Sequence, residues 1–437
     1  MINPILKAPQ AVAPPQVVGA GLAGVEAAWQ LARAGISCRL SEMKPLRFSP
    51  AHGSAALAEL VCSNSFKAER VESAAGLLKA EMRRLGSLCL DCAAWARVPA
   101  GGALAVDRDV FARLVTEAVE AEPLIDLRRE EIYAVPQEGI CVIAAGPLAS
   151  EALSGSMRGL CGDGLHFYDA AAPIVTAESV DMSHAFAASR YERGGEDDYI
   201  NCPLDKAEYE AFHAALVSAE RARTHDFDVY EGCMPIEVLA GRGLDAIRYG
   251  PMKPMGLRDP RTGKRPWAVL QLRKENGAGT LLNLVGFQTN LKFGEQQRVF
   301  AFIPALRSAE FVRYGVMHRN TFIDSPRLLG QDFQCRARPG LYFAGQITGV
   351  EGYMESAASG ILAGIHAARA IRGEAPLRLP PETMLGALSR YISDPGVRDF
   401  QPMGANFGLL PPLAERVRDK RERCARLAER ALEALQI

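Results

Sequence analysis

Hydrophobic and polar positions between residues 17 and 42 follow the pattern of a strand, a helix and a second strand. Val17 and Val18 end a short apolar strand, and Gly35 closes the helix. The apolar positions between them recur at helical spacing: Val25, Ala27, Ala28, Leu31 and Ala32. Residues 36–40 then alternate between apolar and polar side chains, as in a strand, and this strand ends at Glu42. The pattern predicts a βαβ unit at the start of the fold.

The rest of the chain shows further periodic segments. Residues 55–95 are predicted to be mainly helical. From about 185 to 325, charged and aromatic residues become denser, and Gly and Pro turns interrupt short strands. Other predicted elements are strands at 140–146 and 340–346 and helices at 355–372 and 413–436. The last helix carries seven basic and five acidic residues, which we interpret as a solvated face.

The glycines between the first strand and its helix have the spacing Gly19-x-Gly21-x-x-Gly24. Gly19 permits a tight turn, Gly21 lets the backbone approach a pyrophosphate, and Gly24 lets the helix pack close to the strand. The helix N-terminus would face the phosphates, and Glu42 at the end of the second strand would hydrogen-bond ribose hydroxyls. These features predict a dinucleotide site with the following contacts: Gly19, Gly21, Leu22, Ala23, Gly24 and Glu42.

A second glycine element at 340–360 favours FAD over NAD as the dinucleotide. A short strand ends at Ala-Gly, and a helix begins soon after it, as in FAD-binding proteins that return a late segment to the flavin. The predicted contacts there are Gly345, Gln346, Gly349, Val350, Glu351 and Gly352. We therefore expect an α/β fold with a split, Rossmann-like FAD-binding domain of the glutathione-reductase type and an inserted smaller α/β domain. The expected boundaries are 1–185 and 330–437 for the FAD-binding domain and 186–329 for the insertion.

Composition and charge restrict the function further. With 437 residues, two or three domains are expected. The formal net charge of −1 excludes a protein that coats nucleic acid through bulk charge. No apolar run is long enough to span a bilayer, and residues 1–16 lack the apolar core of a secretory signal, so we expect a short leader on a cytoplasmic protein. The ten cysteines are expected to be mostly buried thiols, and no metal site is predicted.

Several motifs resemble those of the folate- and FAD-dependent tRNA (uracil-5-)methyltransferase family, TrmFO. They run in order across nearly the whole chain, which makes the resemblance specific. The matching stretches include GAGLAGVEAAWQLA (19–32), AELVCSNSFK (58–67), VPAGGALAVDR (98–108), YEGCMPIEVLAGRG (230–243), LLNLVGFQTNLKFGEQQRVF (281–300) and YFAGQITGVEGYMESAASG (342–360). The resemblance implies that a methylene carbon from 5,10-methylenetetrahydrofolate forms 5-methyluridine in the T-loop of tRNA. It also implies that reduced FAD supplies electrons and is recharged by NADH or NADPH.

This chemistry requires a nucleophile for C6 of uracil and a group that handles the proton at C5. The resemblance assigns these roles to Cys62 and Cys233, and both lie in turn-like segments with polar or Gly and Pro neighbours. Which of the two attacks C6 is left open, with a slight preference for Cys233. A reactive thiolate needs nearby positive charge, for which Lys67, Arg248 and Lys253 are candidates. Cys141, in an apolar strand, is expected to belong to the core.

Folate and RNA contacts are predicted from aromatic, polar and basic residues of the insertion. Candidate folate contacts are Phe287, Asn290, His318 and Arg319. Residues 248–265 hold six basic residues and one acidic residue, Asp259, a net charge of +5 that marks a candidate phosphate-binding segment. Its basic residues are Arg248, Lys253, Arg258, Arg261, Lys264 and Arg265. A homodimer is compatible with the sequence, although nothing in the sequence requires one.

Four alternatives to a methyltransferase that acts on tRNA remain open at this point. The same chemistry could act on a uridine of ribosomal RNA instead of tRNA. A GidA-like flavoprotein that builds an aminomethyl uridine would normally carry a longer C-terminal helical region. A disulfide reductase would place a redox-active cysteine pair near the flavin, whereas the single CxxC, Cys89 and Cys92, has a helical, apolar context. A catalytically divergent flavoprotein that only binds RNA is the fourth reading.

Overall fold

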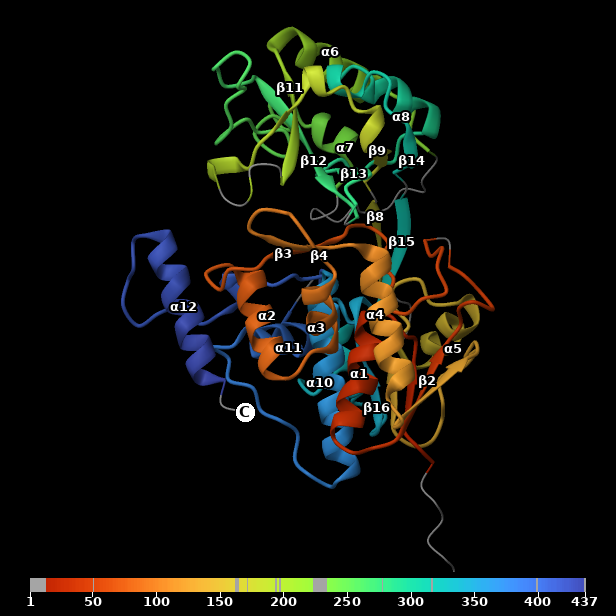
Figure 1. Ribbon diagram of the computed structural model, residues 1–437. Coiled ribbons are helices and arrows are strands. Elements are labelled where there is room, and N and C mark those ends of the chain that lie inside the picture. The colour runs from red at the N-terminus through yellow and green to blue at the C-terminus, as the bar shows by residue number, and fades with distance from the viewer. Residues whose placement is uncertain are drawn as a thin grey trace, which may run out of the picture.

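The computed structural model describes most of the chain and shows two bodies joined by a pair of strands (Figure 1). The described residues are 13–49, 51–161, 165–170, 172–192, 195, 198–222, 234–276, 278–315, 317–397 and 400–435, and the side chains of 161, 165–170, 192 and 317–321 are not among the described features. Cys233 therefore lies outside the described residues.

The first body is built on a five-stranded parallel sheet with the order β16-β7-β1-β2-β6. Its strands are β1 (Gln16–Val18), β2 (Cys38–Glu42), β6 (Ile125–Arg129), β7 (Cys141–Ile143) and β16 (Leu341–Phe343). The last strand comes from the C-terminal part of the chain and pairs with β7, so distant segments complete one sheet. Such a sheet with crossover helices is the Rossmann-like arrangement that the sequence predicts.

Helix α1 (Leu22–Arg33) packs against α10 (Tyr353–Ile371) at very short range. Two glycines of α10 permit this approach, because a Cβ on Gly360 would lie 2.1 Å from the carbonyl oxygen of Ala23, and one on Gly364 would lie 2.6 Å from that of Ala27. The predicted βαβ unit, the strand at 140–146 and the late strand and helix are thus confirmed. Further helices of this body are α2 (Ala74–Arg84), α3 (Leu88–Trp95), α4 (Arg108–Ala121), α5 (Glu151–Cys161), α9 (Ser325–Leu328), α11 (Met384–Ser393) and α12 (Lys420–Ala434).

The prediction that residues 55–95 are mainly helical is wrong for the first half of this range. Helix α2 begins only at Ala74, and a small antiparallel sheet precedes and follows the helices α2 and α3. Its strands are β3 (Ser65–Ala68), β5 (Ala103–Val106) and β4 (Arg97–Val98). The segment before β3 is irregular. Ala58 has a positive φ of 49°, and the side chains of Ser63 and Asn64 hydrogen-bond Arg273 and the carbonyl oxygen of Val106 in other segments.

The second body contains an antiparallel six-stranded sheet with the order β10-β11-β12-β13-β9-β14. These strands are β9 (Ile174–Thr176), β10 (Phe186–Ala187), β11 (Tyr199–Leu204), β12 (Ala268–Lys274), β13 (Leu281–Leu284) and β14 (Phe311–Arg313). Its helices are α6 (Lys206–Ser218), α7 (Ile236–Ala240) and α8 (Phe293–Phe300), and its apolar core is separate from that of the first body. Strand β9 belongs to this sheet, although the predicted insertion begins only at residue 186. The domain boundaries given from the sequence stay a prediction.

Strands β8 (Leu165–Ala170) and β15 (Met317–Phe322) form the antiparallel pair that connects the two bodies (Figure 1). We refer to the second body as the inserted domain, because the chain enters it through β8 and leaves it through β15. Among the described residues, no helix is both long and apolar enough to cross a membrane.

Candidate functional site

The glycine turn after β1 has the tight geometry that the sequence predicts. Gly19 has a φ of 94°, a conformation that side chains other than glycine rarely adopt. A Cβ on Gly24 would lie 1.7 Å from the carbonyl oxygen of Gly19, so the helix can start this close to the strand only without a side chain there. A Cβ on Gly21 would meet no protein atom within 4 Å. Gly21 therefore faces open space, where the first amide groups of α1 can meet an anion.

That open space is a cleft at the carboxyl ends of the parallel strands. It encloses about 1110 Å³ of empty space, including its mouth. Several of the predicted cofactor contacts line it: Gly19, Gly21, Leu22, Ala23, Glu42, Gly345 and Gln346. Its opposite wall is mostly apolar and comes from residues 144–150 after β7. A switch point at the carboxyl end of a parallel sheet is where dinucleotides bind in this class of fold.

Glu42 joins the end of β2 to the glycine turn. Its side chain is buried, with Oε2 accepting a hydrogen bond of 2.8 Å from the amide of Ala20 and Oε1 accepting one of 3.0 Å from the amide of Lys44. An ionised carboxylate has about four acceptor positions, so Glu42 keeps capacity for ribose hydroxyls at the wall of the cleft. The predicted FAD fits this donor and acceptor set.

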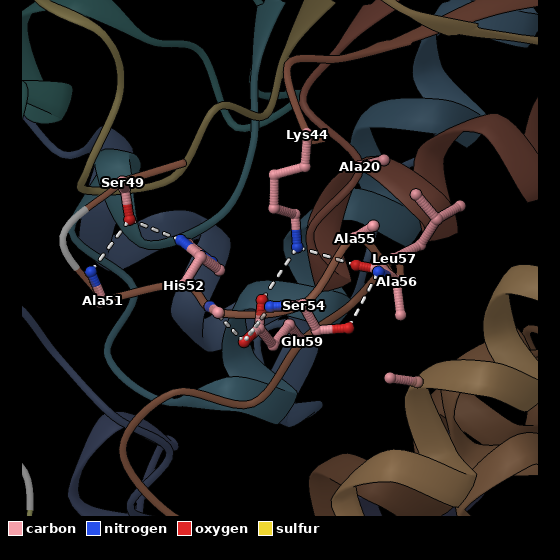
Figure 2. A network of polar contacts seen from close by, with 12 residues as sticks. Ala20, Lys44, Ser49, Ala51, His52, Ser54, Ala55, Ala56, Leu57 and Glu59 are labelled. Carbon is pink, nitrogen blue, oxygen red and sulfur yellow. Dashed lines mark hydrogen bonds and ion pairs between the residues drawn. The ribbon is translucent and has the colours of Figure 1, made fainter. Parts of the chain in front are cut away.

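A buried ion pair supports the loop that follows Glu42, and Figure 2 shows it in the centre of a polar network. Lys44 Nζ lies 3.1 Å from Glu59 Oε2 and donates a hydrogen bond of 2.8 Å to the carbonyl oxygen of Ala56. Glu59 Oε1 accepts from the amides of Gly53 and Ser54, at 2.8 and 3.1 Å. The pair thus closes residues 44–59 into one wall of the cleft.

His52 belongs to the same wall. Its Nδ1 lies 2.6 Å from Ser49 Oγ (Figure 2), and the residue lines the cleft. Burial, with a further contribution from the Lys44 ammonium, lowers the pKa of His52. The neutral imidazole is therefore the form favoured beside the cleft.

The late glycine segment approaches the start of α1. Gly345 has a φ of 88°, and a Cβ there would lie 3.1 Å from the Cβ of Ala23. Gly349 packs against the ring of Phe400, while Gly352 is the N-cap of α10. Glu351 accepts a hydrogen bond of 2.9 Å from the side-chain amide of Gln346. Gly24, Gly349, Val350, Glu351 and Gly352 are not among the residues that line the cleft, and their predicted cofactor contacts stay predictions.

Cys62 lies in the irregular segment before β3, next to the cleft. Its amide donates a hydrogen bond of 2.8 Å to the hydroxyl oxygen of Tyr353, and its side chain also hydrogen-bonds that hydroxyl. Tyr353 and Val61 both line the cleft. Burial, with a further contribution from the Cys62 side chain, raises the pKa of Tyr353 well above its ordinary value, so the phenol stays protonated at neutral pH. Cys62 is therefore held at the edge of the predicted flavin site.

The other described cysteines are all free thiols, and most are buried. Cys141 has no exposed surface in β7, and burial raises its pKa to about 12, which confirms its expected place in the core. Cys89 and Cys92 are buried in α3, and burial raises the pKa of Cys92 to about 12 and that of Cys89 well above its ordinary value. This helix is therefore a poor place for a redox-active pair.

Two of the predicted RNA and folate contacts have surroundings that do not favour the predicted role. The ring of Phe287 is fully buried between Phe212 and Phe300 in the core of the inserted domain, so it has no surface to stack on a pterin. Arg248 is stacked over Trp267 at 3.9 Å, and its side chain is only 17% exposed, so it stabilises the local fold instead of presenting a free charge.

The remaining predicted contacts have mixed settings. Asn290 is buried, and its backbone amide donates a hydrogen bond of 2.8 Å to Glu237 Oε1. Arg261 forms an ion pair with Asp259 at 2.7 Å. The other basic residues of this segment are exposed: Lys253, Arg258, Lys264 and Arg265. His318 and Arg319 lie in β15, and their side chains are outside the described features.

The sequence reasoning missed the residues that surround Cys62. Tyr353 lies 291 positions away from it in the chain. Lys67, one of the three predicted sources of positive charge, is paired with Glu355 at 3.2 Å. The basic side chains that reach the Cys62 segment are Arg108, Arg273 and Arg313. No spacing rule in the sequence connects these arginines to Cys62.

Comparisons with known proteins agree on one family. A family model described as glucose inhibited division protein A matches residues 15–375. A protein of Moorella thermoacetica named methylenetetrahydrofolate–tRNA-(uracil-5-)-methyltransferase TrmFO is 59% identical over 421 residues, which are 95% of this chain and 96% of the relative. Proteins with the same name from Geobacter sulfurreducens and Lactiplantibacillus plantarum are 57% and 55% identical, over 96% and 95% of this chain and 97% and 95% of the relatives.

Solved structures support the fold. GidA of Aquifex aeolicus in its form I crystal is similar with a TM-score of 0.70 and 17% identity, over 96% of this chain and 76% of that one. The form II crystal gives a TM-score of 0.69 and 16% identity, over 96% and 73% of the two chains. At this identity the likeness concerns the fold alone, and it confirms the predicted Rossmann-like fold class.

Proposed function

Since the chain belongs to the glucose inhibited division protein A family and, within it, to the TrmFO methyltransferases, we propose that it methylates C5 of a uridine in tRNA. The carbon would come from 5,10-methylenetetrahydrofolate, the target would be a uridine of the T-loop, and the product would be 5-methyluridine. FAD would be the resident cofactor, with NADH or NADPH as the reductant. The observation that carries the proposal is the 59% identity over 95% of this chain to a relative of that name.

The residues of the cleft fit the binding of FAD. The amide groups at the start of α1 would meet the pyrophosphate, and Glu42 would accept from ribose hydroxyls. Gly345 and Gln346 bring the late segment to the same cleft, beside Tyr353. When bound, FAD would supply the electrons that reduce the transferred carbon to a methyl group.

The chemistry at the uracil needs a thiolate, because C5 is a poor nucleophile until a group adds to C6. A thiolate that adds to C6 places electron density on C5, which can then attack the methylene carbon. The C5 proton must then leave as the bond between the transferred carbon and the folate nitrogen breaks, which releases tetrahydrofolate and leaves a methylene group on C5. Once two electrons and a proton reduce this methylene to a methyl group, the C5–C6 double bond re-forms and the thiolate is released. Two thiols are candidates for this role. Cys62 is held at the cleft by Tyr353, and Cys233 is the second candidate. The proposal assigns the attack on C6 to one of these two cysteines.

The RNA would approach over the exposed basic residues of the inserted domain. Lys253, Arg258, Lys264 and Arg265 are exposed on one turn-rich segment, where they can contact phosphates without a large overall charge. Such contacts predict binding that weakens as the salt concentration rises.

A nucleoside assay tests this function. The purified chain should be yellow with flavin absorbance, and with methylenetetrahydrofolate, NADH and an unmodified tRNA transcript it should form 5-methyluridine, detected by mass spectrometry. Omission of the folate donor or of NADH should abolish the product. Product on a ribosomal RNA fragment but not on tRNA would redirect the assignment to the other RNA, and a colourless protein that binds no FAD would contradict it entirely.

A further inference from the structure

The segment that carries Cys62 is held by arginines from both domains. Arg108, at the start of α4, donates a hydrogen bond of 2.9 Å to the carbonyl oxygen of Leu60. Arg313, at the end of β14 in the inserted domain, donates to the carbonyl oxygen of Val61. The carbonyl oxygens of the two residues that precede Cys62 are thus hydrogen-bonded by arginines of two different domains.

The residues after Cys62 are fixed from the inserted domain as well. Arg273 of β12 donates to Asn64 Oδ1 at 2.7 and 3.1 Å and to Ser63 Oγ at 3.2 Å. Asn64 in turn donates to the carbonyl oxygens of Val106 and Lys274, at 3.1 and 3.0 Å. Asn64 and Arg273 are both buried. The Cys62 segment therefore lies sandwiched between the two domains.

The charges that face this segment are unbalanced. The cations are Arg108, Arg273 and Arg313, whereas Glu275 is the buried anion, and it is already ion-paired with Arg108. Two tyrosines also face the cluster: Tyr353 on α10, whose raised pKa keeps it neutral, and Tyr199 on β11, which interacts with Arg273. The nearby Lys67 and Glu355 form an ion pair of their own at 3.2 Å. Positive charge beside a cysteine favours the thiolate over the thiol.

Arg313 is a cation that interacts electrostatically with the thiol of Cys62. Burial and the neighbouring Arg108 lower its pKa, whereas the anionic forms of Tyr353, Cys62 and Glu275 would raise it. A thiolate at Cys62 would therefore offset part of the cost of holding this guanidinium away from water. The same side chain fixes the peptide oxygen of Val61, so it sets both the position and the charge of the site.

We propose that Arg313 is a positioning residue through which the inserted domain holds Cys62 as its thiolate at the flavin cleft. Deprotonation of the thiol releases its proton to solvent, and the guanidinium stabilises the sulfur anion that remains. Reactivity of Cys62 would then depend on docking of the inserted domain against the Cys62 segment. The role of that thiolate in methyl transfer rests on the proposed function, whereas its formation does not.

Alkylation of Cys62 tests this without any methyl transfer. The FAD-loaded full chain is treated with iodoacetamide between about pH 5 and pH 10, and the rate at the Cys62 peptide is followed by mass spectrometry. For Arg313→Gln we expect the midpoint of the rate profile to rise by about one pH unit relative to the unsubstituted chain. Arg313→Lys keeps the positive charge but loses the planar guanidinium with its several hydrogen-bond donors. Its midpoint should lie between those of the unsubstituted chain and Arg313→Gln. Arg298→Gln, which removes an exposed ion pair on α8, is the matched control and should leave the midpoint unchanged.

A second substitution of opposite charge separates electrostatics from local unfolding. Glu275→Gln removes the anion of the cluster, so its midpoint should move to lower pH. Shifts in opposite directions for Arg313→Gln and Glu275→Gln support the proposal, and so does the Glu275→Gln shift alone if Arg313→Gln does not fold. An Arg313→Gln profile that overlays the unsubstituted one would overturn it, as would shifts of the same sign in both variants. Because the assay contains no RNA or folate, its result is independent of whether the chain methylates tRNA.

Discussion

The amide of Cys62 donates a hydrogen bond of 2.8 Å to the hydroxyl oxygen of Tyr353, and the amide of Ser63 donates a second one of 3.3 Å. One phenol from the first turn of α10 thus fixes the candidate thiol beside the cleft, although 291 positions separate the two residues. The cofactor cleft and the candidate cysteine are therefore coupled by the half-buried side chain of Tyr353.

Tyr353→Phe should lower the methylation rate by about ten- to a hundredfold, because two amides lose their acceptor and the Cys62 segment loses its anchor. FAD binding should be retained, and stability should fall by about 1–3 kcal/mol. Single-turnover rates and urea unfolding measure the two effects. Tyr342→Phe removes a buried hydroxyl from β16 and is the matched control, which should keep full activity. Equal losses in both variants would contradict the anchoring role.

Substitutions of the glycine turn should separate folding from cofactor binding. Gly24→Ala places a Cβ 1.7 Å from the carbonyl oxygen of Gly19, so the turn must move, and we expect a loss of about 1–3 kcal/mol or more in stability. Gly21→Ala meets no protein atom, so the chain should fold normally while its affinity for FAD falls by about tenfold or more. Thermal unfolding without cofactor and flavin titration measure the two quantities. Gly102→Ala, which also meets open space, should change neither.

Breaking the Lys44–Glu59 pair should be costly because both side chains are largely buried, with exposures of 5% and 17%. Lys44→Met leaves the Glu59 carboxylate unpaired, and we expect a loss of about 3–5 kcal/mol together with loss of bound flavin. Removal of the exposed Arg113–Glu117 pair by Arg113→Gln should cost less than about 1 kcal/mol. Similar urea midpoints for the two variants would mean that the buried pair does not support the wall of the cleft.

Stability should also depend on pH through Glu26, whose side chain is fully buried in α1. Burial raises its pKa from 4.5 to about 7, although Ser87 and the amides at the start of α3 hydrogen-bond it. Between these two values the folded state binds the proton more tightly than the unfolded state, so stability falls as pH rises from about 4.5 to 7, by about 3 kcal/mol.

Glu26→Gln removes this titration, so its stability relative to the unsubstituted chain should increase from about pH 5 to pH 8. Urea midpoints at the two pH values measure the change, and Glu117→Gln, on the exposed face of α4, serves as control. A difference between Glu26→Gln and the unsubstituted chain that is the same at both pH values would contradict the assignment.

The sequence predicted the parts of the fold that local patterns encode. The strand, glycine turn and helix at 16–33 are visible as a change of hydrophobic period around Gly19, Gly21 and Gly24, and Cys141 could be placed in the core from its apolar neighbours. The segment before β3 was wrongly predicted to be helical, because its small and apolar residues have helical propensity. Its irregular conformation is instead fixed by long-range hydrogen bonds to Tyr353, Arg273 and Arg313.

The site could be predicted only in part for the same reason. Cys62 and Glu42 stand in recognisable motifs, but the cations around Cys62 come from α4, β12 and β14, and no sequence spacing brings them together. Arg248 could not be placed from the sequence either, since it belongs to a basic stretch that we expected to be exposed, and its guanidinium is stacked on Trp267. Side-chain partners in the folded state decide which charges remain available.

The proposed carbon transfer can be tested most directly by isotope labelling. Methylenetetrahydrofolate with a ¹³C-labelled methylene group is supplied with NADH, the FAD-loaded chain and an unmodified tRNA transcript, and no other methyl donor is added. We predict 5-methyluridine in the T-loop that carries the label in its methyl group. The absence of 5-methyluridine, or its formation without the label, would contradict the proposal that this chain transfers a folate carbon to tRNA.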